Sequence, residues 1–247
     1  MWTREQIKTN AKAVLSKNYW LMLGVSAVYV ILSGIFSSVS SSVSQFSSTE
    51  SQALWEYYQI SPEILLGLAS ISLILSIGSV LFAVFVASPL EVGKNRFFMR
   101  IRLMPTKFSE LFFPFSKAKN FYLNIVKTQF LRSLFTVLWT LLLIVPGIVK
   151  SYEYRMIPYI LAENPSISSK RAFELSKKMT DGEKMNIFVL DLSFIGWSLL
   201  GLLACCIGAY FVQPYFEATY AELYEAMRAK AFDTGITDET ELCNFWN

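Results

Sequence analysis

Six ionisable residues stand within or beside long apolar stretches of this chain: Arg132, Lys150, Glu153, Arg155, Asp191 and Glu217. Charged groups in such surroundings are costly, and they pair with one another, face water or contact a ligand. The chemistry that these residue types support is ion pairing and the lining of a wet cavity. They are therefore the candidate polar sites of the protein.

Two pairings are expected within this set. Lys150 and Glu153 are one helical turn apart, which favours a local structural ion pair. Arg132 and Asp191 each lie a few residues inside an apolar stretch that follows a basic segment, so we expect them at similar depth, where they neutralise each other. Glu217 gives the last apolar stretch a polar side. It either lines a wet cavity or, as the sequence favours, already lies in the aqueous phase.

The chain lacks the residues that most catalytic and metal sites need. It has no histidine, which removes the Ser-His-Asp triad, histidine metal sites and the HExxH motif from consideration. No glycine-rich phosphate loop is present, and the spacing of Cys205, Cys206 and Cys243 fits neither a disulfide framework nor a metal site. We expect no catalytic residue, no metal and no cofactor, and a protein that is not an enzyme.

The composition places the chain in a membrane. Hydrophobic residues make up 53% and charged residues 17% of its 247 residues, whereas soluble domains have about 45–50% and about 25%. The mean hydropathy is +0.41. The lipid bilayer is therefore an expected partner, and the net charge of +3 gives little support for nucleic acid as another.

The apolar stretches predict an all-α fold, a polytopic membrane helical bundle that forms one integral membrane domain over residues 1–247. A helix of about 20 residues crosses the hydrocarbon core. We expect six transmembrane helices, arranged as three hairpins, at residues 19–37, 64–87, 121–145, 148–162, 185–202 and 206–224. The last two require a turn between Gly201 and Gly208. Without it, residues 185–212 form one long span and the count is five.

Five residues are candidate hinges within these spans: Pro89, Pro146, Gly147, Pro158 and Pro214. The Pro146-Gly147 pair is expected to form the tight turn between the third and fourth spans. A proline inside a helix frees the carbonyl four residues earlier, here the carbonyls of Phe85, Tyr154 and Tyr210. Simple kinks are the favoured interpretation of these prolines, and functional hinges are the alternative.

Amphipathic segments are expected between the spans, on the cytoplasmic side. Residues 2–17 begin with a capping-box pattern, Thr3 to Gln6, and predict a surface helix. Residues 108–115 predict a short interfacial helix. Residues 164–182 predict a helix with Ala172, Leu175, Ser176 and Met179 on one face and Gly182 as its stop. Basic residues in these segments make anionic lipids expected partners.

The charge distribution predicts the orientation. The basic clusters at residues 4–17, 94–107, 170–184 and 228–230 fall on one side, whereas the serine-rich loop at residues 37–62 has no Lys or Arg. Positive residues favour the cytoplasmic side. We therefore expect a multi-pass protein of the cell membrane with its N- and C-termini in the cytoplasm.

An ordered set of motifs resembles a known family. The motifs are residues 146–152 (Pro-Gly-Ile-Val-Lys-Ser-Tyr), 157–165, 176–182, 192–197 and 213–215. Together they resemble a family of uncharacterised integral membrane proteins from Gram-positive bacteria, catalogued as a domain of unknown function. The Pro-Gly-Ile segment is also faintly similar to the membrane domain of glycerophosphodiester phosphodiesterases. Neither resemblance implies a catalytic residue, and Ala204-Cys-Cys206 departs from the expected pattern.

These observations favour a non-enzymatic membrane component. The favoured role is an accessory protein, a scaffold or a permease-like subunit of an envelope or export system, with a membrane-protein partner or a homo-oligomer. The alternatives are a lipid-handling protein and a small-solute transporter or channel. A polar cavity that contains Arg132, Asp191 and Glu217 would favour binding or transport over a scaffold role.

Overall fold

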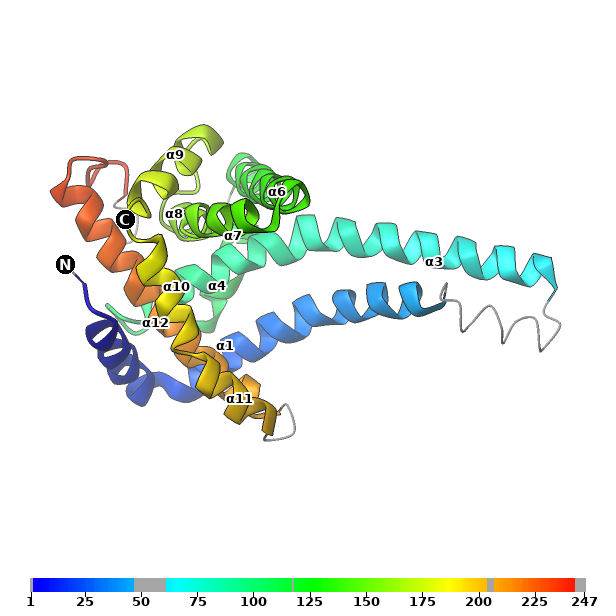
Figure 1. The fold of residues 1–247 in the computed structure, drawn as a ribbon, viewed down its shortest axis with the longest axis horizontal. Coiled ribbons are helices and arrows are strands. Elements are labelled where there is room, and N and C mark those ends of the chain that lie inside the picture. Colours follow the sequence, from blue (N-terminus) through cyan, green and yellow to red (C-terminus); the bar gives the residue numbers. More distant parts are fainter. Residues whose placement is uncertain (1, 47–60, 117, 204–206, 243–247) are drawn as a thin grey trace.

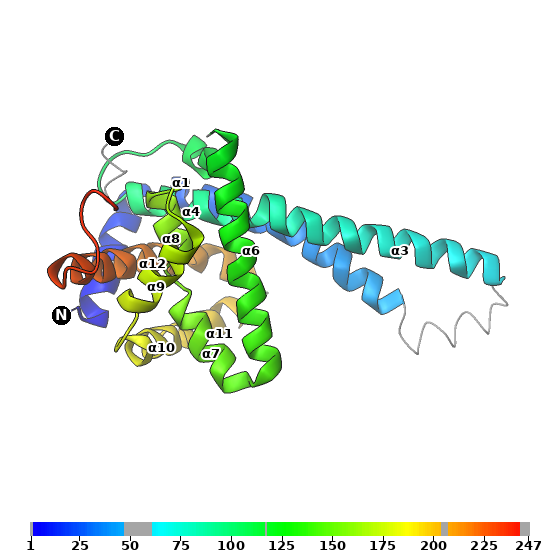
Figure 2. The ribbon, with the colours of Figure 1, turned by 90° about the horizontal axis from the view of Figure 1, so that it is seen from above.

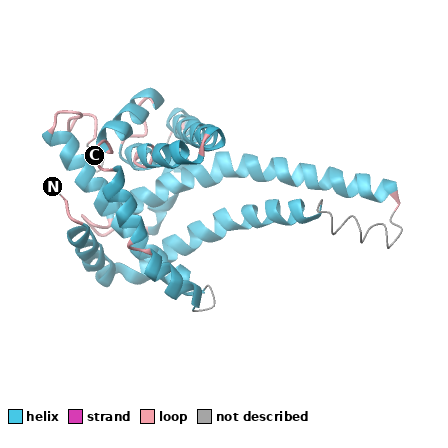
Figure 3. Ribbon diagram, viewed as in Figure 1, coloured by secondary structure: helices cyan, strands magenta, loops and turns pink. Residues whose placement is uncertain are grey.

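The fold was analysed in a computed structural model, which describes residues 2–46, 61–116, 118–203 and 207–242. Every regular element in these ranges is a helix, and no strand occurs among them (Figure 3). The predicted all-α class is therefore confirmed. The loop expected at residues 37–62 is wrong over residues 37–46, which are helical. Residues 47–60 of that loop, Cys205, Cys206, Cys243 and the middle of the turn expected between Gly201 and Gly208 lie outside the described ranges.

Two long apolar helices project side by side from the rest of the protein (Figure 1). The first, α1 (Arg4–Phe46), has a non-helical residue at Asn18, which separates the expected surface helix from the expected first span. The second, α3 (Pro62–Phe82), continues through a π-helical turn, η1 (Ala83–Ala87), into α4 (Ser88–Arg100). Because α3 is apolar on all sides, burying one face against α1 leaves the others exposed.

The chain then passes through η2 (Phe108–Phe112) and the single-turn α5 (Phe113–Ser116) before the long α6 (Lys119–Leu142). The short helix expected at residues 108–115 is thus a 3-10 turn followed by one α turn. Its apolar face consists of Phe108, Leu111, Phe112 and Phe115, of which only Leu111 is fully buried. Close packing of η2 requires Gly93 on α4, because a Cβ there would overlap the Leu111 carbonyl.

The turn expected at Pro146-Gly147 was placed wrongly. The chain reverses at Leu143, an extended residue (φ −157°, ψ 136°), and Pro146 lies in the first turn of α7 (Ile144–Glu153), where its missing N–H costs nothing. Gly147 instead allows close packing, since a Cβ there would lie 2.5 Å from the Thr140 hydroxyl oxygen of α6.

The prediction of an unbroken fourth span at residues 148–162 was also wrong. The helix ends at Glu153, and α8 (Ile157–Glu163) begins after a turn, with Pro158 in its first turn. All seven residues of α8 are buried, and α8 contacts α4, α6 and α9. The proline favours a helix start at this point. This segment is therefore part of the core of the protein.

The amphipathic helix expected at residues 164–182 is confirmed as α9 (Ser169–Met179). Ser168 caps it by accepting a hydrogen bond from the Arg171 N–H, and the four residues predicted on one face are all buried. Gly182 has φ +75°, a conformation that favours glycine and ends the helical segment.

The last three helices are α10 (Lys184–Leu192), α11 (Ile195–Leu203) and α12 (Ile207–Asp233). The fifth span expected at residues 185–202 is broken between α10 and α11, and the alternative of one span over residues 185–212 is wrong. Helices α11 and α12 contact each other, and a Cβ at Gly201 would lie 2.9 Å from the Ala209 nitrogen. Helix α12 continues through Pro214 without a break. It ends at Asp233, nine residues beyond the expected end of the sixth span.

Three helical segments in the described ranges are long and apolar enough to cross a membrane: Arg4–Gly34, Leu66–Arg100 and Lys119–Leu142. The segments containing α3 and α6 run in different directions. Helix α3 lies across the page in Figures 1 and 2, whereas α6 is seen nearly end-on in Figure 1 and lengthwise in Figure 2. The described helices therefore indicate membrane association, with three candidate spans.

The core lies where α4, α8, α9 and α12 meet and is more polar than the projecting helices. Leu90, Phe97 and Ile160 are among its buried residues. Glu163, which has no exposed surface, accepts hydrogen bonds from the Tyr224 hydroxyl at 2.7 Å and from Arg228 Nε at 2.9 Å. A buried carboxylate requires such partners.

Candidate functional site

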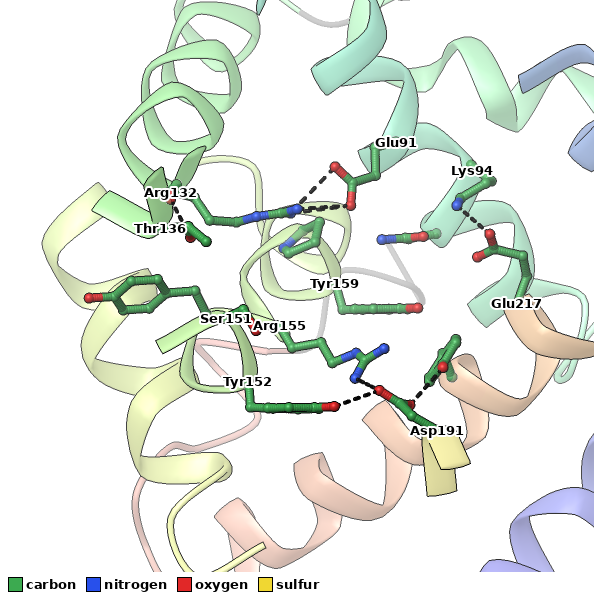
Figure 4. A pocket seen from close by; sticks show the side chains of 14 residues that line it. Glu91, Lys94, Arg132, Thr136, Ser151, Tyr152, Arg155, Tyr159, Asp191 and Glu217 are labelled. Carbon is green, nitrogen blue, oxygen red and sulfur yellow. Dashed lines mark hydrogen bonds and ion pairs between the residues drawn. The ribbon is translucent and has the colours of Figure 1, made fainter. Parts of the chain in front are cut away.

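A polar cavity of about 410 Å³ lies where six helices meet (Figure 4). Its charged residues come from four of these helices and the turn before α8: Glu91 and Lys94 from α4, Arg132 from α6, Arg155 from the turn, Asp191 from α10 and Glu217 from α12. We call it the six-helix pocket. Four of the six candidate residues line it, together with the candidate hinge Pro158.

Three ion pairs line the six-helix pocket. Lys94 Nζ lies 2.5 Å from Glu217 Oε1, Arg132 Nη1 lies 3.2 Å from Glu91 Oε1, and Arg155 Nη1 lies 2.7 Å from Asp191 Oδ2. Three cations thus face three carboxylates. The net charge of these six side chains is therefore zero, and the cavity offers both positive and negative groups.

Asp191 is the centre of a hydrogen-bonded cluster. Besides Arg155, it accepts hydrogen bonds from the Tyr152 hydroxyl at 3.0 Å and the Tyr220 hydroxyl at 2.8 Å. The Arg155 guanidinium also lies over both rings, 5.3 Å from the centre of Tyr152 and 4.5 Å from that of Tyr220. This cluster joins α7, α10 and α12, and it stabilises the charge of Arg155.

The Lys94–Glu217 pair is the most buried of the three, with 7% and 9% of the two side chains exposed. Gln213 donates a second hydrogen bond to Glu217 at 2.9 Å, and the ammonium of Lys94 lies 4.2 Å from the ring centre of Tyr29 on α1. Such pairing lowers the energetic penalty of burying both charges. Glu217 therefore lines the polar cavity, which was the alternative that the sequence favoured less.

The expected Arg132–Asp191 pair is wrong. Arg132 pairs with Glu91 and Asp191 with Arg155, because α4 packs against α6 while α10 packs against α7. Sequence reasoning passed over Glu91 as a candidate. The signal that could have found it is its position two residues after Pro89, where a charged residue directly follows an apolar stretch.

The local pair of Lys150 and Glu153 is confirmed, with 2.6 Å between Nζ and Oε2. Lys184 contacts the other oxygen of Glu153, also at 2.6 Å. Neither Lys150 nor Glu153 is among the residues that line the six-helix pocket. Their geometry fits the structural role that the spacing predicted.

Two buried side chains in the pocket wall have polar groups without a hydrogen-bond partner among the described residues. They are Asn95, which is 3% exposed, and Tyr159, which is 6% exposed. In Figure 4 the Tyr159 hydroxyl points into the pocket, between Arg155 and Glu217. The sequence did not predict a cavity at either residue: Asn95 was not a candidate, and Tyr159 was expected in an interfacial aromatic belt with Tyr152 and Tyr154.

The proline at the start of α4 has the predicted effect on the backbone. The freed carbonyl of Phe85 accepts a hydrogen bond from the Tyr122 hydroxyl of α6 at 2.5 Å, and Ser88 Oγ donates to the Ala83 carbonyl at 2.8 Å. The π-helical turn η1 lies at this point and ends four residues before Glu91. Whether Pro89 and the other candidate hinges move stays a prediction.

The geometry supports binding of a polar small molecule. The volume falls within the range of about 300–1,000 Å³ that is typical of ligand sites. No group of three acidic or cysteine side chains that could hold a metal ion occurs in the part of the chain that the structure describes. The side chains of the pocket offer ion pairs, hydroxyls and an amide.

Comparison with known proteins yields a family match. The model of a family described as "Protein of unknown function (DUF975)" matches residues 1–231. The expected match to a family of unknown function is thus confirmed, whereas the resemblance to the membrane domain of glycerophosphodiester phosphodiesterases and the Gram-positive source stay predictions. No curated protein and no solved structure matches the chain.

Proposed function

We propose that this chain, which belongs to the DUF975 family of proteins of unknown function, is a non-enzymatic integral membrane protein that binds a polar ligand in the six-helix pocket. The observation that carries the proposal is a charged pocket beside helices whose apolar side chains are exposed. Examples are Ile74 of α3, 68% exposed, and Leu141 of α6, 84% exposed. Water disfavours such surfaces, and lipid accommodates them.

The proposed topology keeps the three hairpins and gives each a pair of helices in contact: α1 with α3, α6 with α7, and α11 with α12. Exposed apolar residues cluster where α6 meets α7, from Leu141 to Val145. With 10 and 9 residues, α7 and α11 extend only about 15 Å. We therefore propose six membrane-inserted helices, two of them short, with both termini in the cytoplasm and the cell membrane as the location.

Cysteine labelling tests this topology. In a variant with Cys205, Cys206 and Cys243 replaced by serine, an impermeant maleimide is expected to label Ser47→Cys on intact cells. It is expected to label Asp181→Cys only after the membrane is opened. Labelling of Ser47→Cys only in opened cells would contradict the orientation. Release of the chain from membranes without detergent would contradict membrane insertion.

The proposed role is an accessory, scaffold or permease-like subunit of an envelope or export system. The support for a partner-binding role is that basic residues are grouped in the segments between the hairpins, which suits contact with anionic lipids and other proteins. Purification in a mild detergent, followed by identification of bound proteins, tests the role. A stoichiometric membrane-protein partner supports it, and a partner-free homo-oligomer argues for an autonomous protein.

The pocket favours a second candidate function, in lipid handling or small-solute transport. A scaffold needs no cavity of about 410 Å³ lined by three ion pairs. Uptake and lipid-translocation assays in proteoliposomes test this function. The variant Asp191→Asn with Glu217→Gln is expected to abolish activity there, whereas unchanged activity would remove the two carboxylates from the mechanism.

A further inference from the structure

The six-helix pocket contains polar groups that the protein itself does not satisfy. The Asn95 amide and the Tyr159 hydroxyl are more than nine-tenths buried, line the pocket and have no hydrogen-bond partner among the described residues. A polar group that faces a cavity without a protein partner takes its hydrogen bond from water or from a bound molecule, so both groups are available to a ligand. Each of the two groups both donates and accepts hydrogen bonds.

The charges of the pocket select for a ligand with no net charge. The lining holds three cations and three carboxylates, already joined in three pairs. A ligand with one net charge would leave that charge uncompensated in a poorly solvated site. A zwitterion avoids this penalty, because its anionic group approaches arginine while its cationic group approaches a carboxylate.

The arginines favour a phosphate as the anionic group. Arg132 from α6 and Arg155 from the turn before α8 both line the pocket and carry planar guanidinium groups (Figure 4). Arginine binds phosphate oxygens through paired N–H donors. Each guanidinium has five N–H donors, and a single carboxylate cannot accept all of them. Donors therefore remain for a phosphate.

The tyrosines favour a primary amine over a quaternary one as the cationic group. Quaternary ammonium groups bind against open aromatic faces. Here one face each of Tyr152 and Tyr220 is already covered by the Arg155 guanidinium, and one face of Tyr159 by the ring of Tyr224. A primary ammonium has three N–H donors, which match Glu91, Glu217 and the unpartnered groups of the wall.

Apolar residues next to the pocket indicate a lipid as the source of this group. Phe135, one turn after Arg132 on α6, is exposed, and so are Phe188 and Leu192, which flank Asp191 on α10. A ligand with its polar group in the pocket would therefore have exposed apolar helix surface beside it. This is the arrangement expected for a headgroup with its acyl chains in the bilayer.

We infer that the six-helix pocket binds a phosphoethanolamine group, the headgroup of a zwitterionic membrane lipid, through its ion pairs, Asn95 and Tyr159. The inference rests on the proposed membrane function and names the ligand of the same site. The phosphate lies against the arginines, and the ammonium lies against the carboxylates.

The test measures thermal unfolding of the full-length protein in detergent as lipid is added. The probes are dioleoyl phosphatidylethanolamine, the corresponding phosphatidylcholine and phosphatidylglycerol, and soluble phosphorylethanolamine. Phosphatidylethanolamine is expected to raise the unfolding temperature with an apparent affinity roughly tenfold above that of the other two lipids, the effect of one charge-assisted hydrogen bond.

Two variants connect that effect to the pocket. Tyr159→Phe and Asn95→Leu each remove one unpartnered polar group and leave the three ion pairs intact. Each is expected to weaken the apparent affinity for phosphatidylethanolamine roughly fivefold without lowering the unfolding temperature of the lipid-free protein. Tyr210→Phe is the matched control, because Tyr210 is exposed on α12 and does not line the pocket.

Equal effects of phosphatidylethanolamine and phosphatidylcholine would overturn the inference, as would unchanged affinity in both pocket variants. Stabilisation by soluble phosphorylethanolamine equal to that by the lipid would support the group and overturn its lipid source. A chain that stays in solution without detergent would instead contradict the proposed membrane function. The soluble probe would still test the pocket in that case.

Discussion

The charged residues of the six-helix pocket are connected through partners from distant parts of the sequence. Glu91 accepts hydrogen bonds from two nitrogens of Arg132, from Nη1 at 3.2 Å and 3.4 Å and from Nη2 at 3.3 Å. Gln129, one turn before Arg132, donates to the same carboxylate at 3.1 Å. This arrangement orients the guanidinium at the edge of the pocket.

Exchanging the charges of Arg132 and Glu91 is expected to restore stability that either single reversal removes. The pair lies within hydrogen-bonding distance and is only a quarter exposed, so a coupling of about 1 kcal/mol is expected in a double-mutant cycle. The measurement is the free energy of unfolding in detergent. The corresponding exchange of Arg132 and Asp191 serves as the control, and a larger coupling in that cycle would contradict the observed pairing.

The contact between Arg171 and Glu241 is expected to make the C-terminal segment sensitive to acid. The hydrogen bond from Arg171 Nε, 2.7 Å long, lowers the pKa of Glu241 below its ordinary value of 4.5. A lowered folded-state pKa stabilises the fold fully above pH 4.5, and this contribution is lost as the pH falls through the folded-state value. Hydrogen-exchange protection factors of residues 234–242, which correct for the slower intrinsic exchange in acid, are therefore expected to fall below pH 4.5.

The variant Glu241→Gln provides the control for this pH dependence. It is expected to raise the exchange rate of the same residues at neutral pH and to flatten the acid-induced change. A variant whose protection factors still fall below pH 4.5 as in the unmodified chain would assign the effect to other carboxylates.

At the scale of the elements, the pocket depends on breaks between short helices. Helices α7 and α8 are separated by a turn that contains Arg155, and α10 ends just after Asp191. In an unbroken helix over residues 144–163, Tyr152, Arg155 and Tyr159 would lie on one face along a single axis, since seven residues make about two turns. The turn starts a new axis at α8, so these three residues line the cavity from two helix directions.

The close contact of α6 and α7 predicts that Gly147 is indispensable for their packing. In Gly147→Ala the new methyl group would lie 2.6 Å from the Thr140 Cα, so a loss of about 1–3 kcal/mol in the free energy of unfolding is expected. The matched control is Gly24→Ala, because a Cβ at Gly24 meets nothing within 4 Å. Equal stability of the two variants would contradict this role of Gly147.

At the scale of the whole molecule, polar and apolar surfaces are divided between different regions. The projecting helices α1 and α3 expose apolar side chains (Figure 1), whereas the region around α4, α8, α9 and α12 contains buried ion pairs. Only 6% of the most apolar stretch within the segment Leu66–Arg100, which contains most of α3, is buried. The projecting helices are therefore the part of the molecule whose surface most requires lipid.

Membrane insertion is expected to depend on the exposed face of α3. Replacing Ile74, 68% exposed, by arginine is expected to cost about 2.5–3.5 kcal/mol if this position lies near the bilayer centre. The measurement is the fraction of protein that resists carbonate extraction from membranes. Ile74→Leu is the control. Full insertion of the arginine variant would contradict the placement of α3 in the hydrocarbon region.

Several features followed from the sequence alone, because local pattern determines them. The apolar composition indicated the all-α class and the membrane association, and the period of Ala172, Leu175, Ser176 and Met179 identified the buried face of α9. The spacing of Lys150 and Glu153 predicted their ion pair. Each depends on residues within a few turns of one helix, where sequence distance and spatial distance agree.

Only the tertiary structure decided the partners and the pocket. Arg132 and Glu91 are 41 residues apart, and Lys94 and Glu217 are 123 residues apart, so no local pattern relates them. Depth along a predicted span suggested Asp191 for Arg132, but helix packing determines which faces meet. The buried positions of Asn95 and Tyr159 follow from the same packing, because a cavity is formed by six helices together and by none of them alone.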